Sequence, residues 1–399
     1  MKKIAIIGAG AAGCFCAAEL RRMVPEAHID IYESGKKPLA KVAITGGGRC
    51  NLTNDFQGIT SLAEAYPRGE RLMRRALKVF NQRDTVNWFT QRGVPCTLQD
   101  DHCYFPVSQD AMDIVRTLLH GAKGADIHLG TRIASIRHES KFILVTQDGR
   151  TAEADIVVVT TGGSPKVNTI PDSLGIKTIP PVPSLFTFRI DDPVTSLMGT
   201  VVNANVALAG TPFRADGPLL ITDWGMSGPA ILKLSSYAAR YLNDNAYCAK
   251  LLVNWVGDTE PAVRDALEQH SITQPQKLVR TTTPFPLPSR LWAYIFTRAS
   301  LREDIRWAEL GRKGLNRLAA TISSDQYQIN GRAAFRQEFV TAGGVALTEI
   351  SPRTLESTKY PGLYFAGEIL DIDAITGGFN LQAAWSTAYI VAMSIAESK

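Results

Sequence analysis

Cysteine is sparse in this 399-residue chain and never has the spacing of a metal or disulfide framework. No C-x-x-C pair occurs, so zinc ribbons and disulfide-stapled secreted scaffolds are excluded, and we predict no metal site. Scattered thiols without partners are typical of a reducing compartment, and we therefore expect a cytoplasmic protein. The six cysteines are Cys14, Cys16, Cys50, Cys96, Cys103 and Cys248.

Long apolar runs, blocks of charge and internal repeats are also missing. No stretch approaches the ~20 apolar residues that a membrane-spanning helix needs, so we predict no membrane partner. The net charge is only +5 and no Lys/Arg block is present, which argues against a nucleic-acid partner. With 45% apolar and 20% charged residues the composition is that of a globular protein, and the length predicts two or three packed units.

The N-terminal segment carries a dinucleotide-binding pattern. The apolar run 4–7 predicts a buried strand, residues 8–13 read GAGAAG, and a helix over 14–23 and a strand over 29–32 follow. In such a βαβ unit the first glycine makes a tight turn and the second lets the backbone approach a pyrophosphate. The third glycine lets helix and strand pack closely, and the helix N-terminus faces the phosphates.

Glu33 ends the second predicted strand, where this type of fold binds the adenosine ribose. Its carboxylate can accept hydrogen bonds from both ribose hydroxyls and would repel a 2′-phosphate. The pattern therefore favours FAD or NAD over NADP.

Two more glycine clusters follow in the first half of the chain. Three glycines at 46–48 precede Arg49 and Asn51, which predicts a loop whose amides and guanidinium can hold an anion. The buried strand 156–159 runs into TTGGS at residues 160–164, which suits a backbone packed against a cofactor.

A fourth cluster lies near the C-terminus. Residues 362–368 predict a strand that ends in Gly-Glu, and TGGFN at 376–380 opens a helix over 381–396. The dipole of that helix would favour negative charge that develops on a reduced flavin ring. The dinucleotide fold therefore begins at the N-terminus and is completed by the C-terminal segment.

Other patterns predict local elements between these motifs. Apolar residues at helical spacing run over 70–92, and Ser108 is suited to cap a helix that continues to residue 119. Asp148-Gly149 predicts a hairpin turn between two short strands. Residues 171–193 are rich in proline and predict a linker that crosses into the middle of the chain.

Seven segments occur in order over almost the whole chain: GAGAAG, TGGGRCNLTN, FPVSQDA, TTGGSP, GMSGPA, VTAGGV and LYFAGEILDIDAITGGFNLQAAWSTAY. This set resembles the YhiN/BaiN-like flavoproteins, a branch of the two-dinucleotide-binding-domain FAD superfamily that includes aminoacetone-oxidase-type members. The resemblance implies an α/β fold with a Rossmann-like FAD-binding domain, an inserted β-barrel-like domain and a nested helical domain. The implied limits are 1–188 with 341–399, 189–257 with 322–340, and 258–321, respectively.

At the adenosine end, the resemblance implies that Gly8, Gly10 and Gly13 hold the pyrophosphate. Glu33 would bind the ribose, and the backbone of Ile133 would contact the adenine. These roles are carried over by position in the matching motifs.

At the flavin end, Arg49 and Asn51 would lie by the phosphates and the ribityl chain, and Glu368 would hold the ribityl hydroxyls. Gly378 and Asn380 would approach the isoalloxazine. The other implied cofactor-binding residues are Ala11, Ala12, Lys41, Gly48, Thr161, Gly162, Gly163, Gly367, Gly377 and Phe379.

Two positions depart from the family pattern. Asp223 stands where a histidine is usual, and Ala374 stands where a glycine is usual. Of the loop acids Asp371 and Asp373, we interpret one as a cofactor contact and the other as a cap or a solvent-facing group. No residue pair forms an evident acid–base couple, so no catalytic residue is assigned.

The leading hypothesis is an FAD-dependent oxidoreductase that transfers hydride through flavin N5 to a small organic substrate such as an unsaturated ketone. The chain has no second G-x-G-x-x-G motif, so either NADH or NADPH binds transiently over the flavin as the electron donor, or the second half-reaction uses a different partner. The preference for a reductase rests on family analogy. The alternatives are a flavin-dependent amine oxidase, an RNA-modifying flavoprotein and a non-enzymatic redox sensor, and the oligomeric state stays open.

Overall fold

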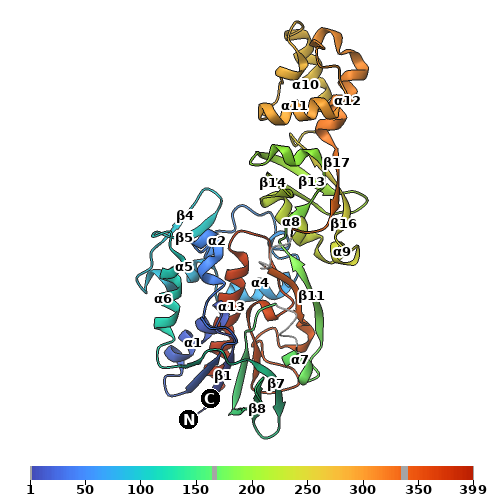
Figure 1. Cartoon of the computed structure of the whole chain (residues 1–399). Helices are drawn as coiled ribbons and strands as arrows, with labels where there is room; N and C mark the ends of the chain where they lie inside the picture. Colours follow the sequence, from blue (N-terminus) through green and yellow to red (C-terminus); the bar gives the residue numbers. More distant parts are fainter. Residues whose placement is uncertain (1, 164–168, 334–339, 399) are drawn as a thin grey trace. The chain divides into compact units, whose positions relative to one another are not determined.

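The computed structural model describes residues 2–163, 169–333 and 340–398 (Figure 1). The chain forms two compact units, Met1–Val182 with Val340–Lys399, and Pro183–Phe339. The three-domain division with the limits given above stays a prediction. Ser164 and Pro165 of the TTGGSP segment and residues 334–339 lie outside the described residues.

A parallel five-stranded sheet forms the centre of the first unit, in the order β19-β10-β1-β2-β6. β19 comes from the C-terminal segment and pairs with β10, so both chain ends build this sheet. The two termini lie close together, and Lys2 Nζ donates a hydrogen bond to Ser398 O at 2.8 Å (Figure 1). The strands are β1 (Lys3–Ile7), β2 (His28–Tyr32), β6 (Asp126–His128), β10 (Ile156–Val159) and β19 (Leu363–Phe365).

Helix α13 is buried along most of its length and packs beside α1 (Figure 1). The Phe15 and Trp385 rings lie 5.4 Å apart at this contact, so apolar surface of both helices leaves water together. The longer helices of this unit are α1 (Ala11–Met23), α4 (Glu70–Val79), α5 (Gln82–Thr90), α6 (Ala111–Gly121) and α13 (Phe379–Glu397). The shorter ones are η1 (Val42–Ile44), α2 (Thr45–Gly48), α3 (Leu62–Ala65), α7 (Thr169–Ser173), η6 (Leu347–Glu349) and η7 (Gly367–Ile369).

Two helix predictions need correction. The pattern over 70–92 is divided into α4 and α5 because the Asn81 side chain accepts hydrogen bonds from the amides of Arg83 and Asp84 and starts a new helix. The cap of α6 is Asp110 and not Ser108, since the Asp110 carboxylate accepts from Met112 N at 2.8 Å.

The first unit also contains three small sheets, β3-β5-β4, β7-β8-β9 and β11-β18. The predicted hairpin at Asp148-Gly149 is confirmed between β8 and β9. The linker prediction for 171–193 is wrong in part, because this segment contains β11, which pairs with β18 despite its prolines. The strands are β3 (Thr53–Asn54), β4 (Cys96–Leu98), β5 (Cys103–Pro106), β7 (Ile133–His138), β8 (Phe142–Thr146), β9 (Thr151–Ala154), β11 (Thr178–Ser184) and β18 (Val340–Val345).

The second unit contains a six-stranded sheet in the order β12-β15-β14-β13-β16-β17. Its edge strands meet where Arg189 N donates to Gly331 O at 2.9 Å, so the sheet is a nearly closed barrel. The strands are β12 (Phe188–Arg189), β13 (Val201–Leu208), β14 (Arg214–Thr222), β15 (Gly225–Ser227), β16 (Cys248–Asn254) and β17 (Asp325–Asn330).

A helical segment is inserted between β16 and β17 (Figure 1). Trp255, Trp292 and Trp307 are buried in the core of this unit. The fold class predicted from the sequence is therefore confirmed. The helices of the unit are η3 (Pro193–Leu197), α8 (Pro229–Tyr237), α9 (Ala239–Asp244), α10 (Glu260–Thr273), η4 (Val279–Thr281), α11 (Ser289–Arg298), η5 (Trp307–Glu309) and α12 (Gly311–Ser323).

All six cysteines are free thiols. Within the described ranges, no helix has both the length and the apolar character of a membrane span.

Candidate cofactor-binding site

The three glycines of the turn after β1 differ in their surroundings. Gly8 has a φ of +110°, and an added Cβ would lie 2.5 Å from Thr160 O. At Gly13 an added Cβ would collide with Gly8 O. At Gly10, by contrast, it would meet no atom within 4 Å among the described residues, apart from the chain neighbours. Packing therefore explains Gly8 and Gly13, whereas the open space at Gly10 suits the approach of a phosphate.

The start of α1 is suited to an anion. Gly10 is its N-cap, no side chain of the described residues caps the helix, and its first turn holds no acidic residue. The first amides therefore keep their donors, and Ala11 and Ala12 leave them uncovered by large side chains. Burial raises the pKa of the nearby Cys14 thiol to about 12, so this group adds no negative charge.

Glu33 is held at the end of β2 by backbone donors. Its carboxylate accepts hydrogen bonds from Ala9 N at 2.9 Å and from Gly35 N at 2.6 Å. These contacts fix both oxygens beside the glycine turn. Oε1 also accepts from Ser34 Oγ at 3.3 Å, whereas Oε2 keeps a lone pair that can accept from a ribose hydroxyl.

A cavity of about 240 Å³ lies against Glu33, lined also by Gly8, Ile133 and Thr161. The buried Thr161 Oγ1 has no hydrogen-bond partner in the part of the chain that the structure describes. Buried hydroxyls are normally bonded, so this atom indicates a missing ligand partner. The cavity, the orphaned hydroxyl and the open space at Gly10 fit the adenosine diphosphate part of FAD.

A second cluster forms around Glu368, whose Oε1 accepts from Thr341 N at 2.9 Å and whose Oε2 lies 3.4 Å from Lys41 Nζ. An added Cβ on Gly163 would lie 3.1 Å from Glu368 Oε1, and one on Gly162 would lie 3.5 Å from Oε2. The carboxylate therefore lies against the glycine pair that follows β10.

Gly367 connects this cluster to α1. An added Cβ there would lie 2.9 Å from Ala12 Cβ, and Gly367 N donates to Thr387 Oγ1 at 2.9 Å. The structure thus brings the Gly-Glu pair to the start of the helix that faces the phosphates.

A third cluster forms where α13 begins. With the Asn51 amide assigned so that its oxygen faces α13, that oxygen accepts from Gly378 N at 3.3 Å, and Asn54 Nδ2 donates to Gly377 O at 3.1 Å. Gly378 is the N-cap, with a φ of +85°, and within the described part of the chain no side chain caps this helix. The loop 45–54 and the glycine pair before α13 are therefore in direct contact, as a shared cofactor site requires.

Two of the predicted cofactor-binding residues, Asn380 and Phe379, make hydrogen bonds within the protein. Asn380 Oδ1 accepts from Ala374 N at 2.9 Å, and its Nδ2 donates to Ala374 O at 2.9 Å, so its amide is used to hold the loop before α13. Phe379 is buried, and its carbonyl accepts from Tyr66 Oη at 2.8 Å. The approach of Asn380 to the isoalloxazine and the cofactor contact of Phe379 stay predictions.

The glycine run 46–48 is a left-handed turn, with φ values of +57°, +69° and +84°. Beside it the Arg49 guanidinium lies 4.4 Å from the centre of the Phe105 ring and 3.4 Å from Gln99 Oε1. Arg49 is therefore directed to the hairpin β4–β5, and its contact with the phosphates stays a prediction. An added Cβ on Gly48 would meet no atom within 4 Å among the described residues, its chain neighbours aside.

Sequence reasoning missed the ion pair that holds the loop between Glu368 and α13. Asp373 is fully buried and binds Arg68 through two guanidinium nitrogens, Nε and Nη2. Nothing in the sequence indicates that Arg68 is the partner of Asp373, because the two residues lie 305 positions apart in the chain. Asp223, the first departure from the family pattern, is exposed in the turn between β14 and β15.

Gln382 is a second missed residue. Its side chain is fully buried and accepts hydrogen bonds from Thr53 Oγ1 at 2.6 Å and Thr85 Oγ1 at 2.9 Å. This network ties the first turns of α13 to β3 and α5. The signal in the sequence is a polar residue near the start of a mostly apolar helix.

The parallel sheet, the glycine turn and the uncapped helices at both ends of the site define a Rossmann-type flavin-dinucleotide-binding protein. The chain belongs to the family described as HI0933-like protein Rossmann domain, whose model matches residues 2–394. It is an FAD-dependent oxidoreductase, and the resemblance stated from its motifs is confirmed.

Similar proteins cover the whole chain. Ribosomal RNA dihydrouridine synthase of Haemophilus influenzae is 31% identical over 98% of this chain and 97% of its own length. The 3-dehydro-bile acid delta(4,6)-reductase of Clostridium scindens is 29% identical over 100% of both. The crystal structure of 3-ketosteroid delta1-dehydrogenase from Sterolibacterium denitrificans covers 100% of both chains with a TM-score of 0.53 at 12% identity, a likeness of fold.

Proposed function

We propose that this enzyme reduces a carbon–carbon double bond conjugated with a carbonyl group and takes its electrons from NADH or NADPH. The names of two full-length relatives support this chemistry from different substrate classes. A 3-dehydro-Δ4,6 bile acid is a conjugated dienone, and dihydrouridine is uridine whose ring double bond, beside a carbonyl, has been saturated. Both reductions add one hydride and one proton across a double bond that a carbonyl activates.

Bound FAD supplies a hydride carrier between a nicotinamide and such a double bond. The chain's own part is to bind and orient. Glu33 and the start of α1 would hold the adenosine diphosphate, and Glu368, which accepts a hydrogen bond from Thr341 N, would bind the ribityl hydroxyls. The amides and the positive dipole end at the start of α13 would stabilise the negative charge of a reduced flavin ring.

A small unsaturated ketone is the first substrate class. The second is a uracil in RNA, favoured by the 31% identical relative and by the start of α12. There Arg312 and Lys313 are exposed, and the first turn of the helix holds no acidic residue. Cations of this kind bind RNA phosphates with a steep dependence on salt.

The proposal is tested by product analysis. Purified protein is incubated with NADH or NADPH and a 3-oxo-4,6-diene steroid, and in parallel with unmodified ribosomal RNA. We expect one substrate to gain two hydrogens, as measured by mass spectrometry.

The variant Arg312→Glu/Lys313→Glu separates the two classes, because it should lower activity on RNA and leave activity on the steroid unchanged. Reduction of neither substrate, combined with oxidation of an amine by the enzyme, would contradict the proposal.

A further inference from the structure

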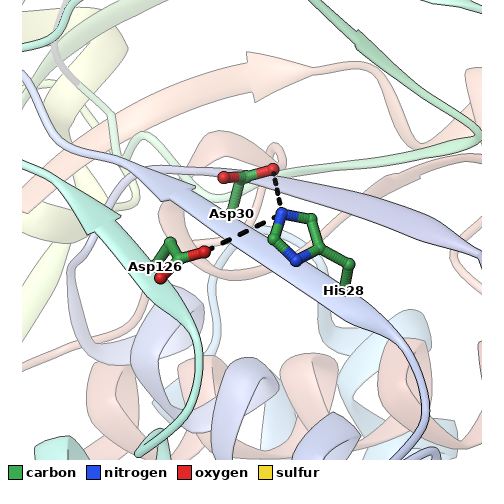
Figure 2. A group of neighbouring side chains, drawn as sticks. All are labelled: His28, Asp30 and Asp126. Carbon is green, nitrogen blue, oxygen red and sulfur yellow. Dashed lines mark ion pairs between the residues drawn. The ribbon is translucent and has the colours of Figure 1, made fainter.

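A cluster of histidine and aspartate side chains lies on one face of the parallel sheet, at its edge strand β6. His28 and Asp30 are two positions apart in β2 and so share a face, and Asp126 of β6 pairs in register with Asp30. His28 Nε2 lies 3.2 Å from Asp30 Oδ2 and 3.8 Å from Asp126 Oδ2 (Figure 2). One possible ligand atom from each residue lies within 4.8 Å of the other two.

Asp30 supplies the second observation. It is only 5% exposed, and its Oδ2 accepts no hydrogen bond from any residue that the structure describes. Its other oxygen lies 2.7 Å from His128 Nε2, and the His128 ring is stacked on Tyr32 with ring centres 4.8 Å apart. The buried carboxylate therefore has one oxygen close to an imidazole, and its other oxygen makes ion pairs with His28 and Lys3 but accepts no hydrogen bond from the described residues, as a metal ligand with an outer support would.

We propose that His28, Asp30 and Asp126 bind a divalent transition-metal ion of the zinc class. One imidazole nitrogen and two carboxylate oxygens suit Zn²⁺ or Mn²⁺, whereas Ca²⁺ and Mg²⁺ prefer oxygen ligands alone. The side chains of His28 and Asp126 are 38% and 66% exposed, so water completes the coordination and the ion exchanges with solvent.

The role of this ion is structural. The cluster lies at the start of β2, whereas Glu33 and the cofactor cavity lie beyond the opposite end of this strand. A bound ion therefore connects the edge strand β6 to β2 and takes no part in hydride transfer. This site could not be predicted from the sequence, because the proposed ligands come from two strands that are far apart in the chain.

A substitution of Lys3 gives an independent test of the proposed metal site. Its Nζ lies 3.6 Å from Asp30 Oδ2, the oxygen that would bind the metal, so the ammonium group competes with the ion. We expect Lys3→Gln to strengthen Zn²⁺ binding, an effect that adventitious binding to a surface histidine would not show.

The experiment is calorimetric titration of Zn²⁺ into the untagged, EDTA-dialysed holoenzyme. We expect one ion per chain, with affinity at least about tenfold lower in His28→Ala and in Asp126→Asn. The matched control is His120→Ala, an exposed histidine at the end of α6, which should bind Zn²⁺ like the wild type.

The visible flavin spectrum of each variant shows whether the first unit remains folded. Because Asp126 is exposed, we expect Asp126→Asn to fold, so this variant still tests the site if His28→Ala does not fold. Wild-type Zn²⁺ affinity in Asp126→Asn, or equal binding of Mg²⁺, would overturn the proposal.

Discussion

Gly10→Ala is expected to lower FAD affinity by about 100-fold or more, with no loss of stability in the FAD-free protein. Gly10 has ordinary backbone angles, φ −87° and ψ −165°, and an added Cβ meets no other part of the described chain within 4 Å. Alanine therefore fits the empty site and loses less chain entropy on folding than glycine. The same methyl group fills the space that a pyrophosphate needs for close backbone approach.

Gly13→Ala is the matched control for this prediction. A Cβ at Gly13 collides with Gly8 O, so this variant should lose stability and FAD together. Thermal unfolding of the FAD-free proteins and titration with FAD give the two quantities separately. If Gly10→Ala purified with full FAD occupancy, the glycine turn would not be the pyrophosphate site.

Asp373→Asn is expected to destabilise the first unit by about 3–5 kcal/mol. Asp373 is fully buried, and the Arg68 side chain that binds it is only 15% exposed. The neutral amide leaves a mostly desolvated guanidinium without its counter-charge, and that penalty exceeds the loss of the ion pair itself. The measurement is urea unfolding followed by flavin release, because all the predicted cofactor-binding residues belong to this unit.

The control is Glu70→Gln, which removes the exposed pair between Glu70 and Arg74 on α4. An exposed helical pair of this type contributes about 0.5 kcal/mol or less. A shift for Asp373→Asn as small as that of Glu70→Gln would contradict the account of the loop before α13.

The fold could be predicted where local pattern and global topology agree. GAGAAG between two apolar runs is sufficient for the first βαβ unit, and the return of a strand near residue 363 shows that the C-terminal segment completes the sheet. Predictions from local propensity fail where a contact with another residue or strand determines the secondary structure. The Asn81 cap divides one helical pattern into two helices. The prolines of β11 argue against a strand, and its partner β18, which stabilises it, lies far along the chain.

The site divides in a similar way. Glu33, Ile133 and Thr161 were predicted from motif positions, and the structure places all three around one cavity. The pairing of Arg68 with Asp373 could not be predicted, since nothing in the sequence near either residue identifies the other. Motifs describe what contacts a cofactor, whereas the residues that hold those motifs in place are determined by long-range packing.

The central claim is that FAD held by this fold carries hydride from a nicotinamide to a conjugated double bond. Its most direct test is the visible spectrum of the anaerobic protein before and after NADH, then NADPH, followed by a 3-oxo-4,6-diene steroid or ribosomal RNA. We predict that the flavin absorbance bleaches with one nicotinamide and returns when the substrate is added. A flavin that stays oxidised with both nicotinamides would contradict the claim.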